Sequence, residues 1–168
     1  MKNVFERLLI FGVLLTTLGC NKDGLTKATR KGANTFSCKV NGRVFKPVYV
    51  GGLFNNGPVL SVRNNEQYDF SIHADNQETS ESISLENPYI QKTGTYKLYA
   101  NHPNRGIYSG STYDPGWYTT DSAHIGELIL TRCDNINHIY SGFFSFKAKD
   151  PNTGRTINVT DGRFDVKE

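Results

Sequence analysis

The stretch FSCKVNGRVFKP, residues 36–47, decides the fold class of this chain. Its first half alternates apolar and polar residues, which is the period of a strand with one buried face. Asn41-Gly42 then separates it from a second alternating run. A type I′ turn needs positive φ at both central residues, so Asn-Gly between alternating runs is a strong hairpin signal. The sequence therefore predicts that the folded part opens with a β-hairpin.

Similar runs continue to the end of the chain, and no stretch shows a convincing helical period. Strands are predicted over residues 59–63, 68–74, 82–86, 94–99, 125–133, 138–149, 156–159 and 163–166. Turn signals recur about every 8–12 residues, the spacing of sandwiches and barrels. The predicted fold class is all-β, a single antiparallel β-sandwich. The alternative is a flattened, lipocalin-like β-barrel, which would suggest an interior ligand.

Alternation also predicts which side chains face the core. In residues 142–148, Phe144, Phe146 and Ala148 form the apolar set, and Phe143 points to the other side. The further core candidates are Val40, Phe45, Phe70, Ile72, Ile83, Leu85, Leu98, Leu128, Leu130 and Phe164.

The first 19 residues read as a targeting segment. Lys2 and Arg7 precede an apolar run from Leu8 to Leu18, and this run is shorter than the ~20 residues that span a bilayer. Residues 15–20, Leu-Thr-Thr-Leu-Gly-Cys, resemble a bacterial lipobox, although Thr17 stands where that pattern usually has Leu. The resemblance implies a lipidated Cys20, with a diacylglyceryl thioether and an N-acyl chain such as palmitate. The alternative is an ordinary signal peptide cut after Gly19.

The organisation that follows has three parts. Residues 1–19 are a lipoprotein signal peptide, and residues 20–34 are the lipidated cysteine and a flexible tether without apolar periodicity. Residues 35–168 are one all-β domain. We expect an outer membrane lipoprotein of the cell envelope, on the periplasmic face or the cell surface.

The cysteines leave two alternatives open. With Cys20 lipidated, Cys38 and Cys133 remain, and an oxidising compartment would allow a disulfide between them. That bond requires the first strand and a late strand to be neighbours. Otherwise both are free thiols in strands, because cysteine is a common core residue.

Charge excludes one class of partner. The full chain has a net charge of +3, and residues 1–19 contribute Lys2, Arg7 and Glu6, which leaves +2 for the rest. The charges are spread without a basic run, so the sequence offers no footprint for nucleic acid.

Two segments together resemble a known family. TFSCKVNGRVFKP, residues 35–47, and HIYSGFFSFKAKDPNTGRTINVTDGRFDV, residues 138–166, are similar to an uncharacterised family of small Bacteroidota lipoproteins with a domain of unknown function. The resemblance implies an envelope lipoprotein with an all-β body, and it implies no catalytic residues.

Motifs for chemistry are sparse, and we predict no catalytic residues, metal or cofactor. There is no Gly-x-Ser-x-Gly elbow, phosphate loop or metal-ligand spacing. His73 and Asp75 could place two ligands on one strand face, but a structural histidine is the more common case. Residues 150–154, Asp-Pro-Asn-Thr-Gly, resemble a calcium loop only in their first half and are better read as a hairpin turn.

Residues 107–118 are richer in aromatics than a β core requires. Tyr108, Tyr113, Trp117 and Tyr118 lie among Gly, Ser and Pro, so they are candidate ligand contacts of a stacking platform. The alternative is that they cap one end of the sandwich.

From these features we expect a non-enzymatic binding or structural module, anchored to a membrane through Cys20. A carbohydrate- or small-ligand-binding lipoprotein, with a glycan or envelope protein as partner, is one alternative. A hydrolase with an unrecognised site is the other.

Overall fold

The computed structural model describes residues 23–51, 58–67, 69–99, 103–112 and 114–168, which form strands and connecting loops. The strands are β1 (Thr35–Val40), β2 (Arg43–Phe45), β3 (Leu60–Asn65), β4 (Asp69–Asn76), β5 (Glu81–Asn87), β6 (Gly94–Leu98), β7 (Arg105–Ser109), β8 (Trp117–Thr119), β9 (Gly126–Asp134), β10 (Ile139–Lys149) and β11 (Thr156–Lys167).

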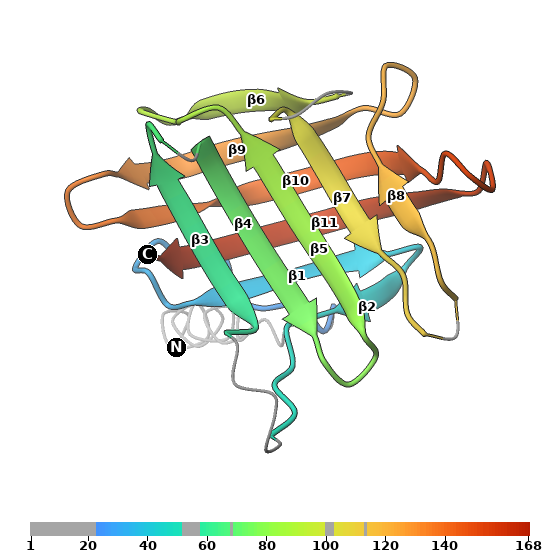
Figure 1. Cartoon of the computed structure of the whole chain (residues 1–168). Helices are drawn as coiled ribbons and strands as arrows, with labels where there is room; N and C mark the ends of the chain where they lie inside the picture. The colour runs from blue at the N-terminus through green and yellow to red at the C-terminus, as the bar shows by residue number, and fades with distance from the viewer. Residues whose placement is uncertain (1–22, 52–57, 68, 100–102, 113) are drawn as a thin grey trace, which may run out of the picture.

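These strands form one antiparallel sheet that curls into two layers (Figure 1). The front layer has the order β3-β4-β5-β7-β8, and the back layer has the order β2-β1-β11-β10-β9-β6. The layers join where Lys149 of β10 pairs with Thr119 of β8. The prediction of an all-β fold is therefore confirmed, and the curled sheet is a half-barrel that shares features of both predicted architectures.

The predicted first hairpin is present. Asn41 and Gly42 have φ values of 48° and 84°, as a type I′ turn requires, and Val40 pairs with Arg43 across the turn. The hairpins around residues 64–67 and 134–137 are also present, between β3 and β4 and between β9 and β10.

Side chains fill the space between the layers. Every core candidate from the sequence is at most 3% exposed, whereas Phe143 is 41% exposed on the outer side of β10. Aromatic rings meet in this core, with the Phe36 and Phe144 ring centroids 4.9 Å apart. At ~25 cal/mol per Å² of buried apolar surface, this core supplies the main stabilisation of the domain.

The last two predicted strands are one strand with a bulge. Residues 156–159 and 163–166 both lie in β11, and its register shifts between them against both β1 and β10. Ile157 and Val159 face the core before the shift, and Phe164 and Val166 face it afterwards. The extra residue thus moves the buried side from the odd-numbered residues of β11 to the even-numbered ones.

A segment ahead of β1 crosses the outer face of the back layer. We call Asp23 to Asn34 the strap. Leu25 is only 4% exposed, and the Thr26 N–H donates to Ser37 Oγ of β1 at 3.0 Å. Further along, the Arg30 side chain donates to the Thr131 carbonyl of β9. The strap's blue trace lies beside β1 in Figure 1.

One carboxylate holds the middle of the strap. Asp165 of β11 accepts hydrogen bonds from the backbone N–H groups of Lys31 and Gly32, at 2.9 and 2.8 Å, and from the Thr29 hydroxyl. Burial raises the pKa of Asp165, but these hydrogen bonds outweigh it and lower the pKa to about 2. Asp165 and Ser141 are fully buried on the outer face because the strap covers them.

The prediction of a flexible tether over residues 20–34 therefore needs correction. From Asp23 onward the segment is bonded to β1, β9 and β11, so the structured domain begins before Thr35. Residues 20–22, including Cys20, lie outside the described residues.

The candidate disulfide is also corrected. Cys38 and Cys133 are both free, with Cys38 buried on β1 and Cys133 partly buried on β9. Strands β11 and β10 lie between them, so three strand spacings of ~4.7–4.9 Å separate β1 from β9, whereas a disulfide joins Cα atoms ~4.4–6.8 Å apart. Burial raises the pKa of both thiols.

Candidate functional site

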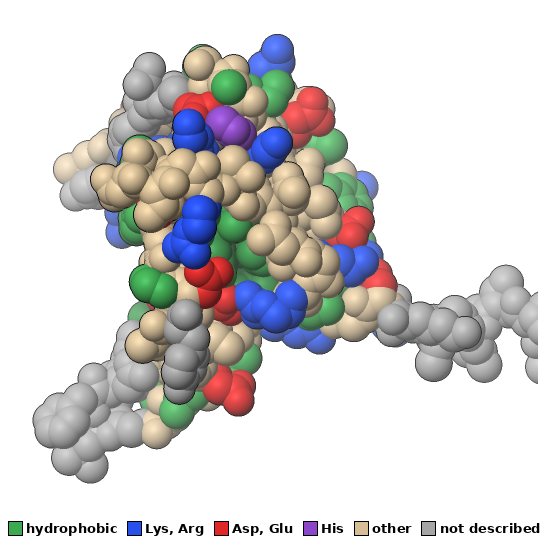
Figure 2. Space-filling model, turned by 90° about the vertical axis from the view of Figure 1, so that its right-hand side faces the viewer, with side chains coloured by type: hydrophobic (Ala, Val, Ile, Leu, Met, Phe, Trp, Pro, Cys, Tyr) green, Lys and Arg blue, Asp and Glu red, His purple; other side chains and the backbone are tan. Residues whose placement is uncertain are grey.

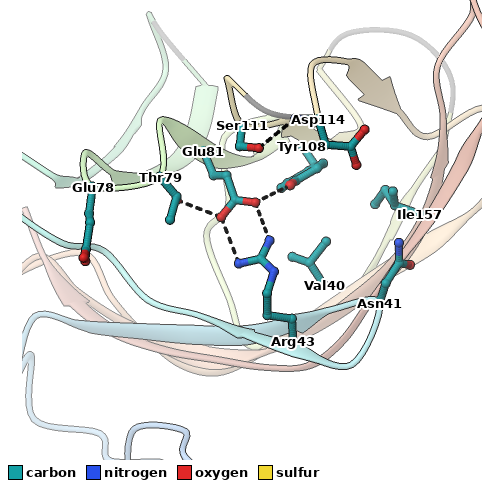
Figure 3. Close-up of a pocket in the computed structure, with 10 residues that line it drawn as sticks. All are labelled: Val40, Asn41, Arg43, Glu78, Thr79, Glu81, Tyr108, Ser111, Asp114 and Ile157. Carbon is teal, nitrogen blue, oxygen red and sulfur yellow. Dashed lines mark hydrogen bonds and ion pairs between the residues drawn. The ribbon is translucent and has the colours of Figure 1, made fainter.

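A cleft of about 470 Å³ opens at one end of the sandwich, which we call the cleft end. Figure 2 shows the molecule from this side, with basic, acidic and hydrophobic side chains close together. Three hairpins and β11 meet here (Figure 3). The lining residues are Val40, Asn41, Arg43, Glu78, Thr79, Glu81, Tyr108, Ser111, Asp114 and Ile157.

The base of the cleft is a buried carboxylate from the front layer. Glu81 starts β5 and is 3% exposed. The two terminal guanidinium nitrogens of Arg43, on β2 of the back layer, donate to it, Nη1 at 3.0 Å. The Tyr108 hydroxyl donates at 2.6 Å and the Thr79 hydroxyl at 2.8 Å. Each carboxylate oxygen therefore has two donors, and the group ties the two layers together (Figure 3).

The surroundings of Glu81 and Tyr108 hold each group in one protonation state at neutral pH. Burial raises the pKa of Glu81, but the hydrogen bonds from Arg43, Tyr108 and Thr79 outweigh it and lower the pKa below its usual 4.5. Burial and the neighbouring carboxylate raise the pKa of Tyr108. The carboxylate thus stays ionised and the phenol stays neutral at neutral pH.

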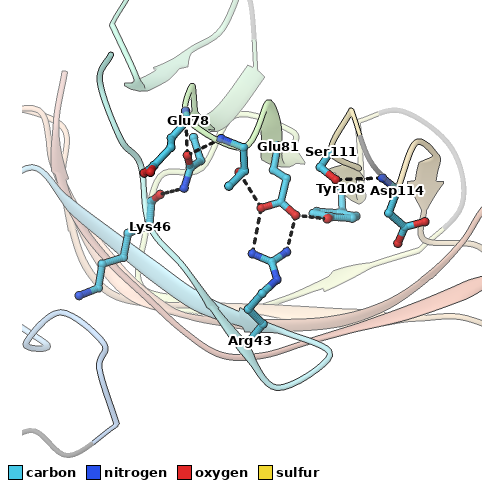
Figure 4. Close-up of polar contacts among 9 residues, drawn as sticks. Arg43, Lys46, Glu78, Glu81, Tyr108, Ser111 and Asp114 are labelled. Atoms are coloured by element: carbon cyan, nitrogen blue, oxygen red, sulfur yellow. Dashed lines mark hydrogen bonds and ion pairs between the residues drawn. The ribbon is translucent and has the colours of Figure 1, made fainter. Parts of the chain in front are cut away.

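The turn between β4 and β5 positions Glu81. Asn76, at the end of β4, accepts hydrogen bonds from the backbone N–H groups of Glu78 and Thr79, at 3.0 and 3.1 Å. Its side-chain amide donates to the Lys46 carbonyl at 3.1 Å, which links the turn to the chain after β2 (Figure 4). Asparagine suits this place because its short amide bonds to backbone groups in turns.

The mouth of the cleft carries a second ion pair. Arg155 donates to Asp114 at 2.6 Å and to the Pro115 carbonyl at 2.6 Å, and its guanidinium lies 5.9 Å from the ring centroid of Tyr118. Asn41, Glu78 and Ser111 are polar groups at the same mouth. The arrangement can hydrogen-bond a ligand at its rim, whereas its buried carboxylate is already saturated.

The sequence did not single out Arg43 or Glu81. They are 38 residues apart in the chain, and neither belongs to a catalytic or ligand-binding motif. The available signal was that Glu81 lies two residues before Ile83, on the same side of the strand as the core candidates Ile83 and Leu85.

The four aromatic residues predicted as ligand contacts do not form one exposed surface among the described residues. Tyr108 and Tyr118 pair across β7 and β8 and are 4% and 2% exposed, so they belong to the core. Trp117, at the start of β8, is 52% exposed on the outer face of the front layer. Tyr113 lies outside the described residues. The described residues therefore retain one of the proposed contacts, and the two tyrosines close this end of the sandwich.

Two glycines explain this packing. A Cβ at Gly116 would lie 2.4 Å from the Tyr118 ring, and a Cβ at Gly110 would lie 2.2 Å from the Asp114 carbonyl oxygen. The Gly110 N–H also donates to the Gly116 carbonyl at 2.8 Å. The glycines permit a tight hairpin against a buried ring, which composition resembling a binding loop does not reveal.

The remaining candidates have structural contacts. His73 Nε2 lies 3.0 Å from Asp75 Oδ1, and His73 Nδ1 lies 2.7 Å from Ser84 Oγ. Asp150 accepts from the Asn152 N–H and the Thr153 hydroxyl, which closes the hairpin turn between β10 and β11. Within the described ranges, no three His, Cys, Asp or Glu side chains are grouped to hold a metal ion.

The fold and the cleft define a small all-β domain whose two layers are tied by the ion pair of Arg43 with the buried Glu81. A family model described as a domain of unknown function, DUF6252, matches residues 34–166, and the chain belongs to this family. Neither the curated proteins nor the solved structures contain a match. In the part of the chain that the structure describes, no helix has the length and hydropathy to cross a membrane.

Proposed function

We propose that this protein is a membrane-anchored envelope lipoprotein whose all-β body is a non-enzymatic binding or structural module. The attachment of the strap is the observation that carries the proposal. A lipid on Cys20 would lie three residues before Asp23, the first residue of a segment bonded to three strands. The lipobox-like residues 15–20 supply the attachment point, and several acyl chains give stable anchoring.

The cleft supports the non-enzymatic part of the proposal. A general acid or base needs a group that can exchange a proton near the working pH. Glu81 has a lowered pKa and four hydrogen bonds, which suits a structural ion pair. The rim groups can bind polar ligands without reacting with them.

Anchoring is tested by expressing the full chain in a bacterium and labelling it with an alkyne fatty acid. We expect label on the wild type and on Cys38→Ser and Cys133→Ser, which are matched controls, but not on Cys20→Ser. An unlabelled wild type that leaves the membrane in buffer would contradict the proposal.

A second candidate is carbohydrate binding, favoured by the outer face of the front layer. Trp117 pairs with Ser109, Ser109 with Ser82, and Ser82 with Asp75. An exposed indole beside a row of small polar residues offers stacking and hydrogen bonds to a sugar. A stacked ring contributes about 1–3 kcal/mol in other platforms.

A glycan array with the purified protein tests this candidate. We expect Trp117→Ala to weaken any array hit by tenfold or more with an unchanged melting temperature. Tyr99→Ala, which removes another half-exposed aromatic, is the control. Equal binding by both variants would remove Trp117 from the site.

A further inference from the structure

We infer that the strap face, the outer face of the back layer covered by residues 23–34, lies against an anionic lipid surface. The inference rests on the proposed anchoring through Cys20, and it adds an orientation to it. The front layer, with Trp117, would then face away from the membrane.

Chain length limits how far the domain can move from the lipid. Cys20 lies three residues before Asp23, and an extended chain spans at most ~3.3–3.6 Å per residue, so the limit is about 11 Å. Asp23 is itself held, because its carboxylate pairs with Arg163 of β11 and accepts from the Leu25 N–H at 3.0 Å. The anchor therefore emerges at the strap face.

The strap directs its bonding groups, the Arg30 guanidinium among them, toward the sheet and two lysines outward. Leu25, Thr26 and Thr29 contact the sheet. Lys27 and Lys31 are exposed, and among the residues described neither has a carboxylate partner. Because the strap lies flat on the sheet, its exposed side chains point away from the domain.

The same face carries further groups that suit an interface. Arg30 is exposed on the strap, and Phe143 of β10 is 41% exposed. Ala28, Arg30 and Phe143 line a hollow of about 190 Å³. Two acids of this face are engaged, since Asp165 is covered by the strap and Asp23 is paired with Arg163. Basic residues around an apolar group favour adsorption to anionic headgroups.

The test uses the lipidated full chain, purified in detergent and reconstituted into vesicles. A water-soluble lysine-acylating reagent is applied in detergent, on pure phosphatidylcholine vesicles, and on vesicles that also contain phosphatidylglycerol. Labelling at each lysine is read by peptide mass spectrometry.

On anionic vesicles we expect labelling of Lys27 and Lys31 to fall at least fivefold relative to detergent. Lys92, an exposed lysine in the loop before β6, is the internal control and should change less than twofold. An equal change of labelling at Lys27, Lys31 and Lys92 would overturn the orientation while anchoring stands. Absence of lipid on Cys20 in the same spectra would overturn both proposals.

A charge-reversal pair provides a second measurement. With Cys20→Ser, so that no lipid holds the protein, Lys27→Glu with Lys31→Glu should weaken binding to phosphatidylglycerol vesicles. Each basic residue near the surface is worth roughly fivefold, so the pair should lose about 25-fold or more. Arg63→Glu, on the outer face of the front layer, with Lys92→Glu carries the same charge change and should lose less than fivefold. Equal losses for the two pairs would mean that net charge, and not the strap face, controls binding.

Discussion

The two ends of the sandwich are closed by different chemistry. At the cleft end, the Arg43–Glu81 ion pair joins β2 to β5. At the other end, Asn64 of β3 accepts from the Ile90 N–H at 2.9 Å and donates to the Ile90 carbonyl at 2.7 Å. The Asn64 amide also donates to Asn135, which accepts a hydrogen bond from Tyr140 of β10. We call this the amide end.

The difference follows from what each end must satisfy. The amide end buries a loop backbone, and one asparagine supplies both a donor and an acceptor to it. The cleft end remains open to solvent, so the Arg43 side chain is 53% exposed while its partner is buried. The same fold thus uses a neutral network where water is excluded and an ion pair where water has access to one partner.

The largest effect should come from removing the buried charge. Glu81→Ala leaves Arg43, Tyr108 and Thr79 without their common acceptor, and we expect a loss of about 3 kcal/mol in the free energy of unfolding. Urea denaturation measures it. Glu78→Ala, an exposed glutamate of the same turn, should cost less than ~0.5 kcal/mol. Equal costs for the two variants would show that Glu81 does not join the layers.

Asn64→Leu should cost about 2 kcal/mol, because it leaves the buried Ile90 N–H without a partner at the amide end. Asn152→Leu, at an exposed asparagine in the turn after β10, is the control and should be near neutral. If urea denaturation gives the two variants the same stability, the network at the amide end is dispensable.

Acid should distinguish the ends. Folding lowers the pKa of Glu81, so its contribution is fully present above the unfolded pKa near 4.5 and is lost as the pH falls through the folded pKa. The stability difference between wild type and Glu81→Gln should shrink as the pH is lowered from 7 past 4.5. The difference between wild type and Asn64→Leu should stay constant, since Asp165 titrates equally in both. A pH-independent difference for Glu81→Gln would contradict the lowered pKa.

Salt should give the smallest effect. Because Arg43 is half exposed, its attraction to Glu81 is partly screened, and we expect less than ~1 kcal/mol between low and high ionic strength. Chemical denaturation by urea at several NaCl concentrations measures it, with Glu81→Gln as the reference. A salt effect of the same size in Glu81→Gln would assign it to other surface charges.

Local pattern predicted the layers but not how their ends meet. Alternation correctly assigned Phe144 and Phe146 to the core and Phe143 to the outside, and Asn41-Gly42 identified the first turn. These properties depend on neighbours in the sequence. The partners Arg43 and Glu81 are brought together only by the curl of the sheet, which no local period encodes.

The predictions of a flexible tether and of an aromatic platform were wrong for a related reason. The strap has no apolar periodicity because backbone N–H groups bind it to Asp165, more than 130 residues away. In the hairpin, Gly116 leaves room for the Tyr118 ring and Gly110 for the Asp114 carbonyl, and composition cannot separate these roles from that of a binding loop.

Because of the bulge in β11, the number of residues in this strand, and not only their type, decides which side chains face the core and which face the strap. With one residue fewer between Val159 and Arg163, either Ile157 and Val159 or Phe164 and Val166 would turn outward. In the second case Asp165 would enter the core and the strap would lose its acceptor. A single-residue deletion here therefore moves the side chains of half the strand to the opposite face. Homologous chains should accordingly vary in length at their loops and keep the number of residues in β11 fixed.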